Sequence, residues 1–140
     1  MSDRTVYITD FDRKRLEELL VVALEYMTSS EDSESLEILA REVERGKSVE
    51  AMAVGPDVIT MNSKVRLLDP ETGEHVSYEL VFPSDANMSE RRVSVLAPLG
   101  SAMLGESVGD LITFNAPGGP RKLVVDAILY QPEAAGDYDR

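Results

Sequence analysis

The chain contains no cysteine, no tryptophan and only one histidine among its 140 residues. The lack of cysteine excludes a disulfide framework, a thiol nucleophile and a zinc ribbon. The one histidine, His75, leaves no histidine-rich metal site, and it stands at the start of an expected strand beside a polar turn, where we expect an exposed side chain. We therefore predict that the chain has no catalytic residue, binds no metal and needs no cofactor.

Basic residues are also scarce, since 14 Lys and Arg stand against 26 Asp and Glu and give a formal net charge of −12. Such a charge repels polyanions, so direct binding to DNA or RNA is not expected. No apolar run approaches the ~20 residues of a membrane span, and residues 1–4 lack the apolar core of a signal peptide. We expect a cytoplasmic monomer of about one domain, with no membrane partner.

The first third of the chain has the apolar spacing of amphipathic helices. Apolar residues recur three and four positions apart over residues 16–27 and again, over a shorter stretch, at 36–43. Between them, residues 28–33 have the sequence Thr-Ser-Ser-Glu-Asp-Ser, a composition that favours turns and helix caps. We therefore predict a short antiparallel α-hairpin, a small coiled coil, over residues 1–46, which needs the rest of the protein for its stability.

Polar residues mark the start of the first expected helix. Thr9 and Asp10 follow the apolar Ile8 and can cap the helix through a side-chain oxygen. Asp10 and Asp12 carry negative charge where the helix dipole favours it, so we interpret both as local features of the helix N-terminus.

From residue 58 onward, apolar and polar residues alternate in short stretches, which is typical of half-buried strands. The expected strands cover residues 64–69, 76–82, 92–96, 111–115 and 121–130. Pro98 fits the first position of a short helix that Gly105 would end. We predict an α+β domain over residues 58–131, a mostly antiparallel sheet with one short helix, preceded by a linker at 47–57 and followed by a polar tail at 132–140.

Three blocks in this second part carry a family resemblance: residues 97–105 (Ala-Pro-Leu-Gly-Ser-Ala-Met-Leu-Gly), 108–110 (Val-Gly-Asp) and 116–119 (Ala-Pro-Gly-Gly). Their sequences and spacing resemble the C-terminal domain of the bacterial Gre transcript-cleavage factors. This resemblance implies an FKBP-like fold for the sheet domain. Residues 58–63 and 130–138, together with the short N-terminal hairpin, resemble a branch of the family whose hairpin is shorter than that of the Gre factors.

The resemblance also implies a partner. Gre factors dock their globular domain on the rim of the RNA polymerase secondary channel and insert a helical hairpin into that channel. For the short-hairpin branch, the resemblance implies binding to RNA polymerase in competition with Gre factors, without stimulation of transcript cleavage. By their place in the resembling segments, the residues expected to dock are Leu99, Gly100, Ser101 and Met103, with Asn62 and Ser63 as weaker candidates.

Acidic residues cluster between the two expected helices, at Glu31, Asp32 and Glu34. These carboxylates could hold a divalent cation, as the resemblance to the tips of Gre hairpins implies. We favour instead a solvated loop and helix N-terminus, since residues 10–27 would span only ~27 Å as a helix, less than the Gre hairpin. The Gre tip motif, Gly-Asp-Leu-x-Glu-Asn, is also absent, so we transfer no catalytic role to these residues.

Two other functions stay open at this point. An FKBP-like fold raises peptidyl-prolyl isomerisation, but that activity needs an apolar pocket rimmed by aromatic side chains, and the chain has 3 Phe, 5 Tyr and no Trp. Direct regulation of nucleoside diphosphate kinase is also compatible with the resemblance, although no kinase-binding motif is visible. The segment Pro-Gly-Gly-Pro at residues 117–120 predicts a tight β-hairpin turn rather than a phosphate loop.

Overall fold

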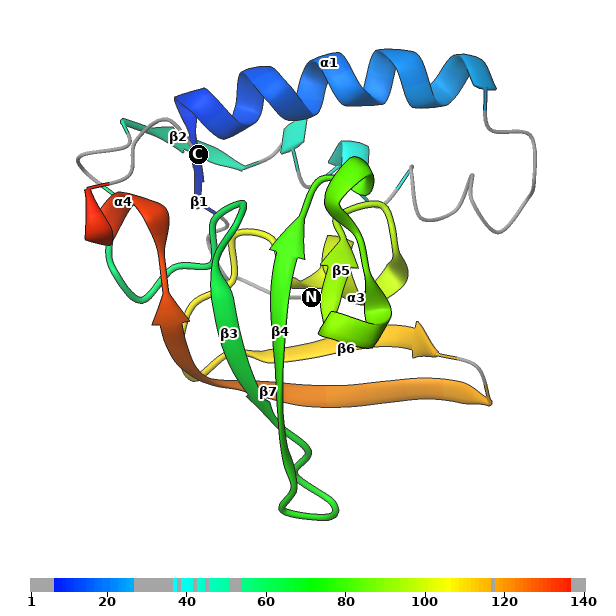
Figure 1. The fold of residues 1–140 in the computed structure, drawn as a ribbon, viewed down its shortest axis with the longest axis vertical. Helices are drawn as coiled ribbons and strands as arrows, with labels where there is room; N and C mark the ends of the chain where they lie inside the picture. The colour runs from blue at the N-terminus through cyan, green and yellow to red at the C-terminus, as the bar shows by residue number, and fades with distance from the viewer. Residues whose placement is uncertain are drawn as a thin grey trace.

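The computed structural model describes residues 7–26, 37, 39–41, 43–44, 46–50, 54–116 and 118–136. Within these residues a curled five-stranded sheet forms the body of the molecule, and one long helix lies across one end of it (Figure 1). The predicted α+β class is confirmed, because the sheet is antiparallel apart from one pair of strands and the helices are few. No helix in the described part is long and apolar enough to cross a membrane.

The sheet has the strand order β5-β4-β3-β7-β6. Its strands are β3 Lys64–Leu68, β4 His75–Val81, β5 Arg92–Ser94, β6 Leu111–Ala116 and β7 Gly119–Tyr130. β7 pairs with both β3 and β6, and two register shifts in its pairing with β3 bend the strands and help the sheet to curl. Between β4 and β5 the chain forms two short 3₁₀ helices, η2 Pro83–Asp85 and η3 Met88–Glu90, and returns to a point beside Glu79, so that β5 runs parallel to β4.

All five predicted strands are present, and each end lies within two residues of its predicted position. β6 and β7 pair across the turn predicted at residues 117–120, where Gly118 has a φ of 93°. Glycine adopts such a left-handed angle without steric cost, so the turn needs it. The short helix α3, Pro98–Met103, also begins at the proline that predicts it.

The N-terminal part holds α1, Asp10–Tyr26, and a small parallel sheet of β1, Tyr7–Thr9, and β2, Lys47–Val49. The described residues between 37 and 44 are helical, in the place of the second predicted helix. The sequence does not predict β1 and β2, because three residues are too few to show a strand period; the expected linker at 47–57 therefore begins with a strand.

One hydrophobic core joins the N-terminal part to the sheet. The buried residues of α1, Leu16 and Leu20, belong to the same cluster as Leu39 and Val43 and as the inner side chains of the sheet domain. Because the apolar stripe over 36–43 is short, the N-terminal part cannot form a sizeable core alone. The N-terminal part and the sheet domain therefore share one core instead of having separate ones.

The polar tail predicted at residues 132–140 begins with a short helix in the described part of the chain. α4 covers Pro132–Ala135, and both Pro132 and Glu133 are buried. The side-chain nitrogen of Gln131 donates to the backbone oxygens of Gly55 at 2.8 Å and Val58 at 2.7 Å. Polar composition predicts exposure, but here the polar groups satisfy a backbone segment that lies 73 and 76 residues earlier in the sequence.

Candidate interaction surface

α3 lies against β5 and β6, and most of its side chains point into the core. Of the predicted docking residues on this helix, Leu99 is 8% exposed, Ser101 1% and Met103 0%, and Gly100 is buried. These side chains are buried in this structure, so the residues of this segment that reach the surface are its neighbours, and direct docking by the four buried residues stays a prediction. A six-residue helix that lies flat between two strands buries more of its surface than helical spacing alone predicts.

Gly100 allows α3 to approach β5 closely. A Cβ at this position would lie 1.9 Å from the backbone oxygen of Ser94 and 3.0 Å from the Cα of Val95. Both neighbours are backbone atoms, which cannot rotate away, so a larger residue does not fit without moving the helix. The role of Gly100 is therefore to place α3 on the sheet.

The exposed part of the same segment is small and apolar. Pro98 is exposed, and Leu96, Ala97 and Ala102 are half-buried. We call these four residues the α3 surface. They are the part of the segment that a partner can reach without any change in the core.

The turn of residues 60–63 holds the two weaker docking candidates. Asn62 has a φ of 67°, a left-handed angle that asparagine tolerates, and its N–H donates to the backbone oxygen of Leu80 at 2.6 Å. Ser63 is fully buried, and its Oγ accepts a hydrogen bond from the Thr60 N–H at 3.0 Å. Asn62 is half-buried and is thus the only one of the six predicted docking residues with partial exposure.

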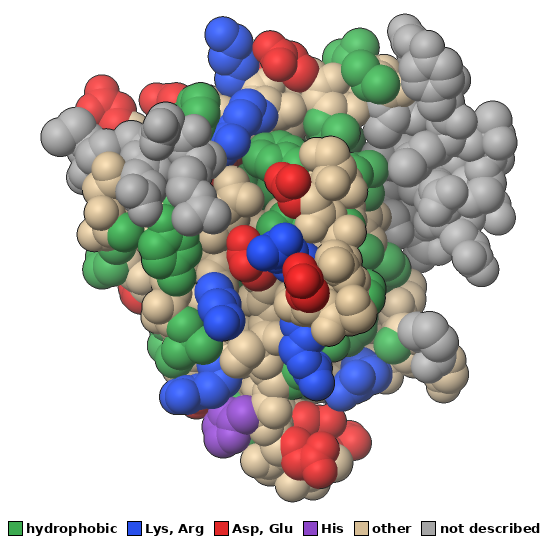
Figure 2. Space-filling view, in the orientation of Figure 1, with side chains coloured by type: hydrophobic (Ala, Val, Ile, Leu, Met, Phe, Trp, Pro, Cys, Tyr) green, Lys and Arg blue, Asp and Glu red, His purple; other side chains and the backbone are tan. Residues whose placement is uncertain are grey.

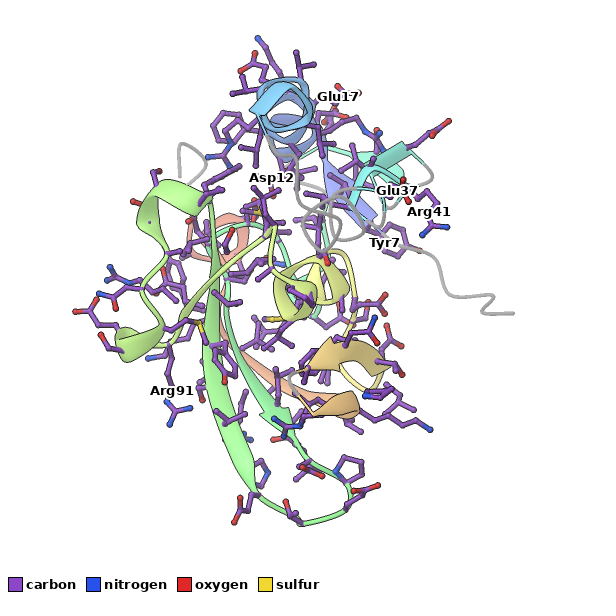
Figure 3. All side chains as sticks on the ribbon, turned by 90° about the vertical axis from the view of Figure 1, so that its right-hand side faces the viewer. Tyr7, Asp12, Glu17, Glu37, Arg41 and Arg91 are labelled. Carbon is purple, nitrogen blue, oxygen red and sulfur yellow. The ribbon has the colours of Figure 1, made fainter. Side chains whose placement is uncertain are left out.

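The N-terminus of α1 is capped as predicted, since the N–H of Asp12 donates to the Thr9 Oγ1 at 3.1 Å. The side chain of Asp12, however, is not a local feature of the helix end. It is 1% exposed and accepts a hydrogen bond from the Met61 N–H at 2.9 Å. Figure 3 shows Asp12 on the side of α1 that faces the rest of the molecule. The sequence offers one sign of this role, because Asp12 stands four residues before Leu16, on the apolar stripe of the helix.

A second buried carboxylate meets the same turn from the other end of the chain. Glu133 of α4 is 7% exposed, and its Oε1 accepts a hydrogen bond from the Thr60 Oγ1 at 2.6 Å. No local pattern in the sequence indicates this contact, because it joins two residues that lie 73 positions apart. The turn of residues 60–63 therefore connects α1, β4 and α4.

Burial raises the pKa of Asp12 above its usual value of 3.8, against the opposing effects of the Met61 hydrogen bond and Arg15. The carboxyl group of Asp12 therefore holds its proton more tightly in the folded protein than in the unfolded chain. Its ionisation lowers the stability of the fold at neutral pH, and this destabilisation disappears as the group is protonated at low pH. We expect wild type to gain stability relative to Asp12→Asn as the pH falls from neutrality to about 4. Urea unfolding of both proteins across this range measures the difference, and a constant difference contradicts the expectation.

The predicted acidic tip at Glu31, Asp32 and Glu34 lies outside the described residues. α1 itself has 17 residues and therefore a length of about 25 Å. His75, at the first position of β4, is exposed as predicted, and its Nε2 lies 3.5 Å from Asp126 Oδ2. Within the described ranges, no three histidine or acidic side chains are grouped so that they could hold a metal ion.

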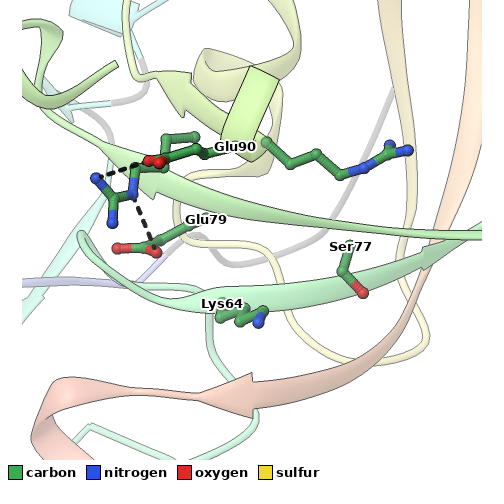
Figure 4. Close-up of a pocket in the computed structure, with 6 residues that line it drawn as sticks. Lys64, Ser77, Glu79 and Glu90 are labelled. Atoms are coloured by element: carbon green, nitrogen blue, oxygen red, sulfur yellow. Dashed lines mark ion pairs between the residues drawn. The ribbon is translucent and has the colours of Figure 1, made fainter. Parts of the chain in front are cut away.

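Basic side chains gather on the face of the molecule below α1 (Figure 2). A shallow hollow of about 340 Å³ there is lined by Lys64, Ser77, Glu79, Glu90, Arg91 and Arg92. Arg92 pairs with Glu90 at 3.4 Å and with Glu79 at 3.8 Å (Figure 4). Both carboxylates of the hollow therefore face the same arginine, and the hollow is a polar surface that carries charges of both signs.

The family model described as "Transcription elongation factor, GreA/GreB, C-term" matches residues 54–130. The chain belongs to this family. Over 139 residues, this Gre-family protein is 37% identical to the Regulator of nucleoside diphosphate kinase of Escherichia coli, across 99% of this chain and 98% of the relative. It is also 30% identical to a transcription inhibitor protein of Thermus thermophilus, across 90% of this chain and 91% of the relative.

The fold of this Gre-family protein is similar to that of a solved structure, the prokaryotic transcription elongation factor GreA/GreB from Nitrosomonas europaea. The TM-score is 0.74 at 32% identity, and the match covers 91% of this chain and 100% of that chain. The resemblance to Gre factors carried by residues 97–119 is thereby confirmed and extends over most of the chain. The names of these relatives describe regulators and transcription factors, so the protein is a Gre-like regulator related to transcription.

Proposed function

We propose that this protein binds RNA polymerase at the rim of the secondary channel and competes there with Gre factors, without stimulating transcript cleavage. The observation that carries the proposal is the family match over residues 54–130, which include α3, the turn of residues 60–63 and all five strands of the sheet. In this proposal, residues 58–131 form an FKBP-like docking domain and residues 1–46 form an antiparallel α-hairpin.

The size of the N-terminal part supports the absence of cleavage. α1 ends at Tyr26 after about 25 Å, so we expect the hairpin to stop before the active site of the polymerase. The similarity to a protein named as a transcription inhibitor, over 90% of this chain, also favours inhibition over cleavage. The protein would then act by occupying the docking site.

Binding and cleavage are tested together with purified RNA polymerase. We expect the protein to be retained by immobilised polymerase, to be displaced by an excess of a Gre factor, and to leave the RNA of a backtracked complex at its original length. Shortening of the RNA above the rate of polymerase alone, or binding that a Gre factor does not reduce, contradicts the proposal. Pro98→Glu on the α3 surface is expected to weaken binding by about fivefold or more, whereas Thr113→Glu, on the outer side of β6, should not.

The name of the Escherichia coli relative favours a second candidate, direct regulation of nucleoside diphosphate kinase. The same retention experiment with purified kinase in place of polymerase distinguishes the two functions. Retention of the kinase alone supports the second candidate, and retention of polymerase alone supports the first.

A further inference from the structure

Among the described residues, the first two turns of α1 make polar contacts with several other segments of the chain. Leu16 and Leu20 pack in the shared core, and the driving force for burying them is itself not directional. Three neighbouring polar side chains, Asp12, Arg13 and Arg15, make directional contacts with three separate segments.

Asp12 connects α1 to the turn of residues 60–63. Its Oδ2 accepts the hydrogen bond from the Met61 N–H, and the side chain is 1% exposed. The turn is itself fixed to the sheet, because the Asn62 N–H donates to Leu80 of β4 at 2.6 Å. A buried N–H that loses its acceptor costs about 1–3 kcal/mol in other proteins, so this contact resists separation of the helix from the sheet.

Arg15 connects α1 to the end of β4. Its guanidinium carbon lies 4.0 Å from the centre of the Phe11 ring, in α1, and 4.7 Å from the centre of the Phe82 ring, directly after β4. Its Nη2 also pairs with Asp12 Oδ1 at 2.5 Å. A planar guanidinium can stack on aromatic rings and donate in its own plane at the same time, which an ammonium group cannot do.

Arg13 connects α1 to the segment that leads into β2. Its Nη1 donates to the backbone oxygen of Val43 and its Nη2 to that of Gly46. Val43 belongs to the second helical stretch, and Gly46 directly precedes β2. Carbonyls at the end of a helix attract a cation, so this contact is also charge-assisted.

We infer that Asp12, Arg13 and Arg15 form a joint that holds α1, the segment that leads into β2 and the sheet domain in one orientation, so that the free protein is a single rigid body. The consequence for binding rests on the proposed function. A partner that contacts both the sheet domain and the helix pays less conformational entropy when their relative orientation is already fixed. The joint residues are positioning residues and need not touch the partner.

The orientation can be measured directly because the chain has no cysteine of its own. Spin labels are attached to Glu18→Cys on α1 and Thr113→Cys on β6, both exposed, and pulsed electron paramagnetic resonance gives the distribution of the distance between them. We expect one narrow peak with the joint intact. Arg13→Ala with Arg15→Ala is expected to widen the distribution by about twofold or more, with the sheet domain still folded. Lys14→Ala removes an exposed cation from the same turn and should leave the peak unchanged.

Arg15→Lys separates charge from shape. Lysine keeps a positive charge beside Asp12 but cannot lie flat on the rings of Phe11 and Phe82. We therefore expect Arg15→Lys to widen the distance distribution almost as much as Arg15→Ala does. If the double variant does not fold, the two single alanine variants decide by the same measurement. A broad distribution in the protein with the intact joint, or a narrow one in both single variants, overturns the inference.

Polymerase binding by the same variants, without labels, gives an independent result. With the joint loosened, affinity is expected to fall by about tenfold, since the orientation must then be fixed on binding. If the distances widen but wild type does not bind polymerase, the joint stands and the proposed function fails. If polymerase binds wild type while the distances stay narrow in the single variants, the proposed function stands and the joint is wrong.

Discussion

Replacing Gly100 with alanine is expected to lower the free energy of unfolding by about 3 kcal/mol or more. The new Cβ would lie 1.9 Å from the oxygen and 2.8 Å from the carbonyl carbon of Ser94, distances that only a movement of backbone can relieve. α3 would have to lift from β5, and Leu99 and Met103 would then leave the core together. The loss comes from this separation, because alanine itself favours a helix over glycine.

Urea unfolding of wild type and Gly100→Ala measures the change, and Ala102→Gly is the matched control. Ala102 is half-buried in the same helix, so the control also changes one methyl group but should cost no more than about 1 kcal/mol. If helix propensity alone determined the effect, Gly100→Ala would gain stability while Ala102→Gly loses it, and that outcome would contradict the close approach to β5.

The strands and the start of α3 could be predicted from the sequence because their determinants are local. Alternation of apolar and polar side chains defines a strand over a few residues, and Pro98 marks a helix start by its fixed φ alone. The turn between β6 and β7 is likewise determined by the glycines it contains. The resemblance to Gre factors rests on these same segments, which explains why both agree with the structure.

The attachment of α1 to the sheet domain could not be predicted, because its determinants are distant in sequence. Asp12 suits a helix N-terminus by charge, and nothing near it in the sequence points to the Met61 N–H, 49 residues away. Gln131 and Glu133 likewise lie in a stretch whose polar composition predicts exposure. In each case a polar side chain satisfies a buried partner, which only the folded arrangement reveals.

For the predicted docking residues, the sequence indicates the segment but not which of its side chains are exposed. The resemblance identifies the segment around α3, and the segment does reach the surface, at Pro98. Which side chains point outward is decided by how the helix lies between β5 and β6, and the sequence of so short a helix does not determine this. The side chain chosen as a contact, Met103, therefore turns out to be fully buried.

Met103→Glu is for this reason expected to unfold the protein at neutral pH rather than to remove one contact with a partner. Met103 is 0% exposed and belongs to the shared core, so a glutamate there would bring an unpaired carboxylate into an apolar environment. The expected loss is about 4 kcal/mol or more, a large part of the stability of an ordinary domain. Loss of polymerase binding by this variant would then report loss of the fold.

Met103→Leu distinguishes loss of the fold from loss of a direct contact with polymerase. It keeps the volume and apolar character of the side chain, so its cost should stay below about 1.5 kcal/mol and its binding to polymerase should equal that of wild type. The glutamate variant should also recover part of its stability as the pH falls, because a buried carboxyl holds its proton more tightly than one in the unfolded chain. Circular dichroism and urea unfolding of both variants give the answer. A glutamate variant as stable as wild type would mean that the side chain reaches solvent, and Met103 would then return as a candidate for direct contact with polymerase.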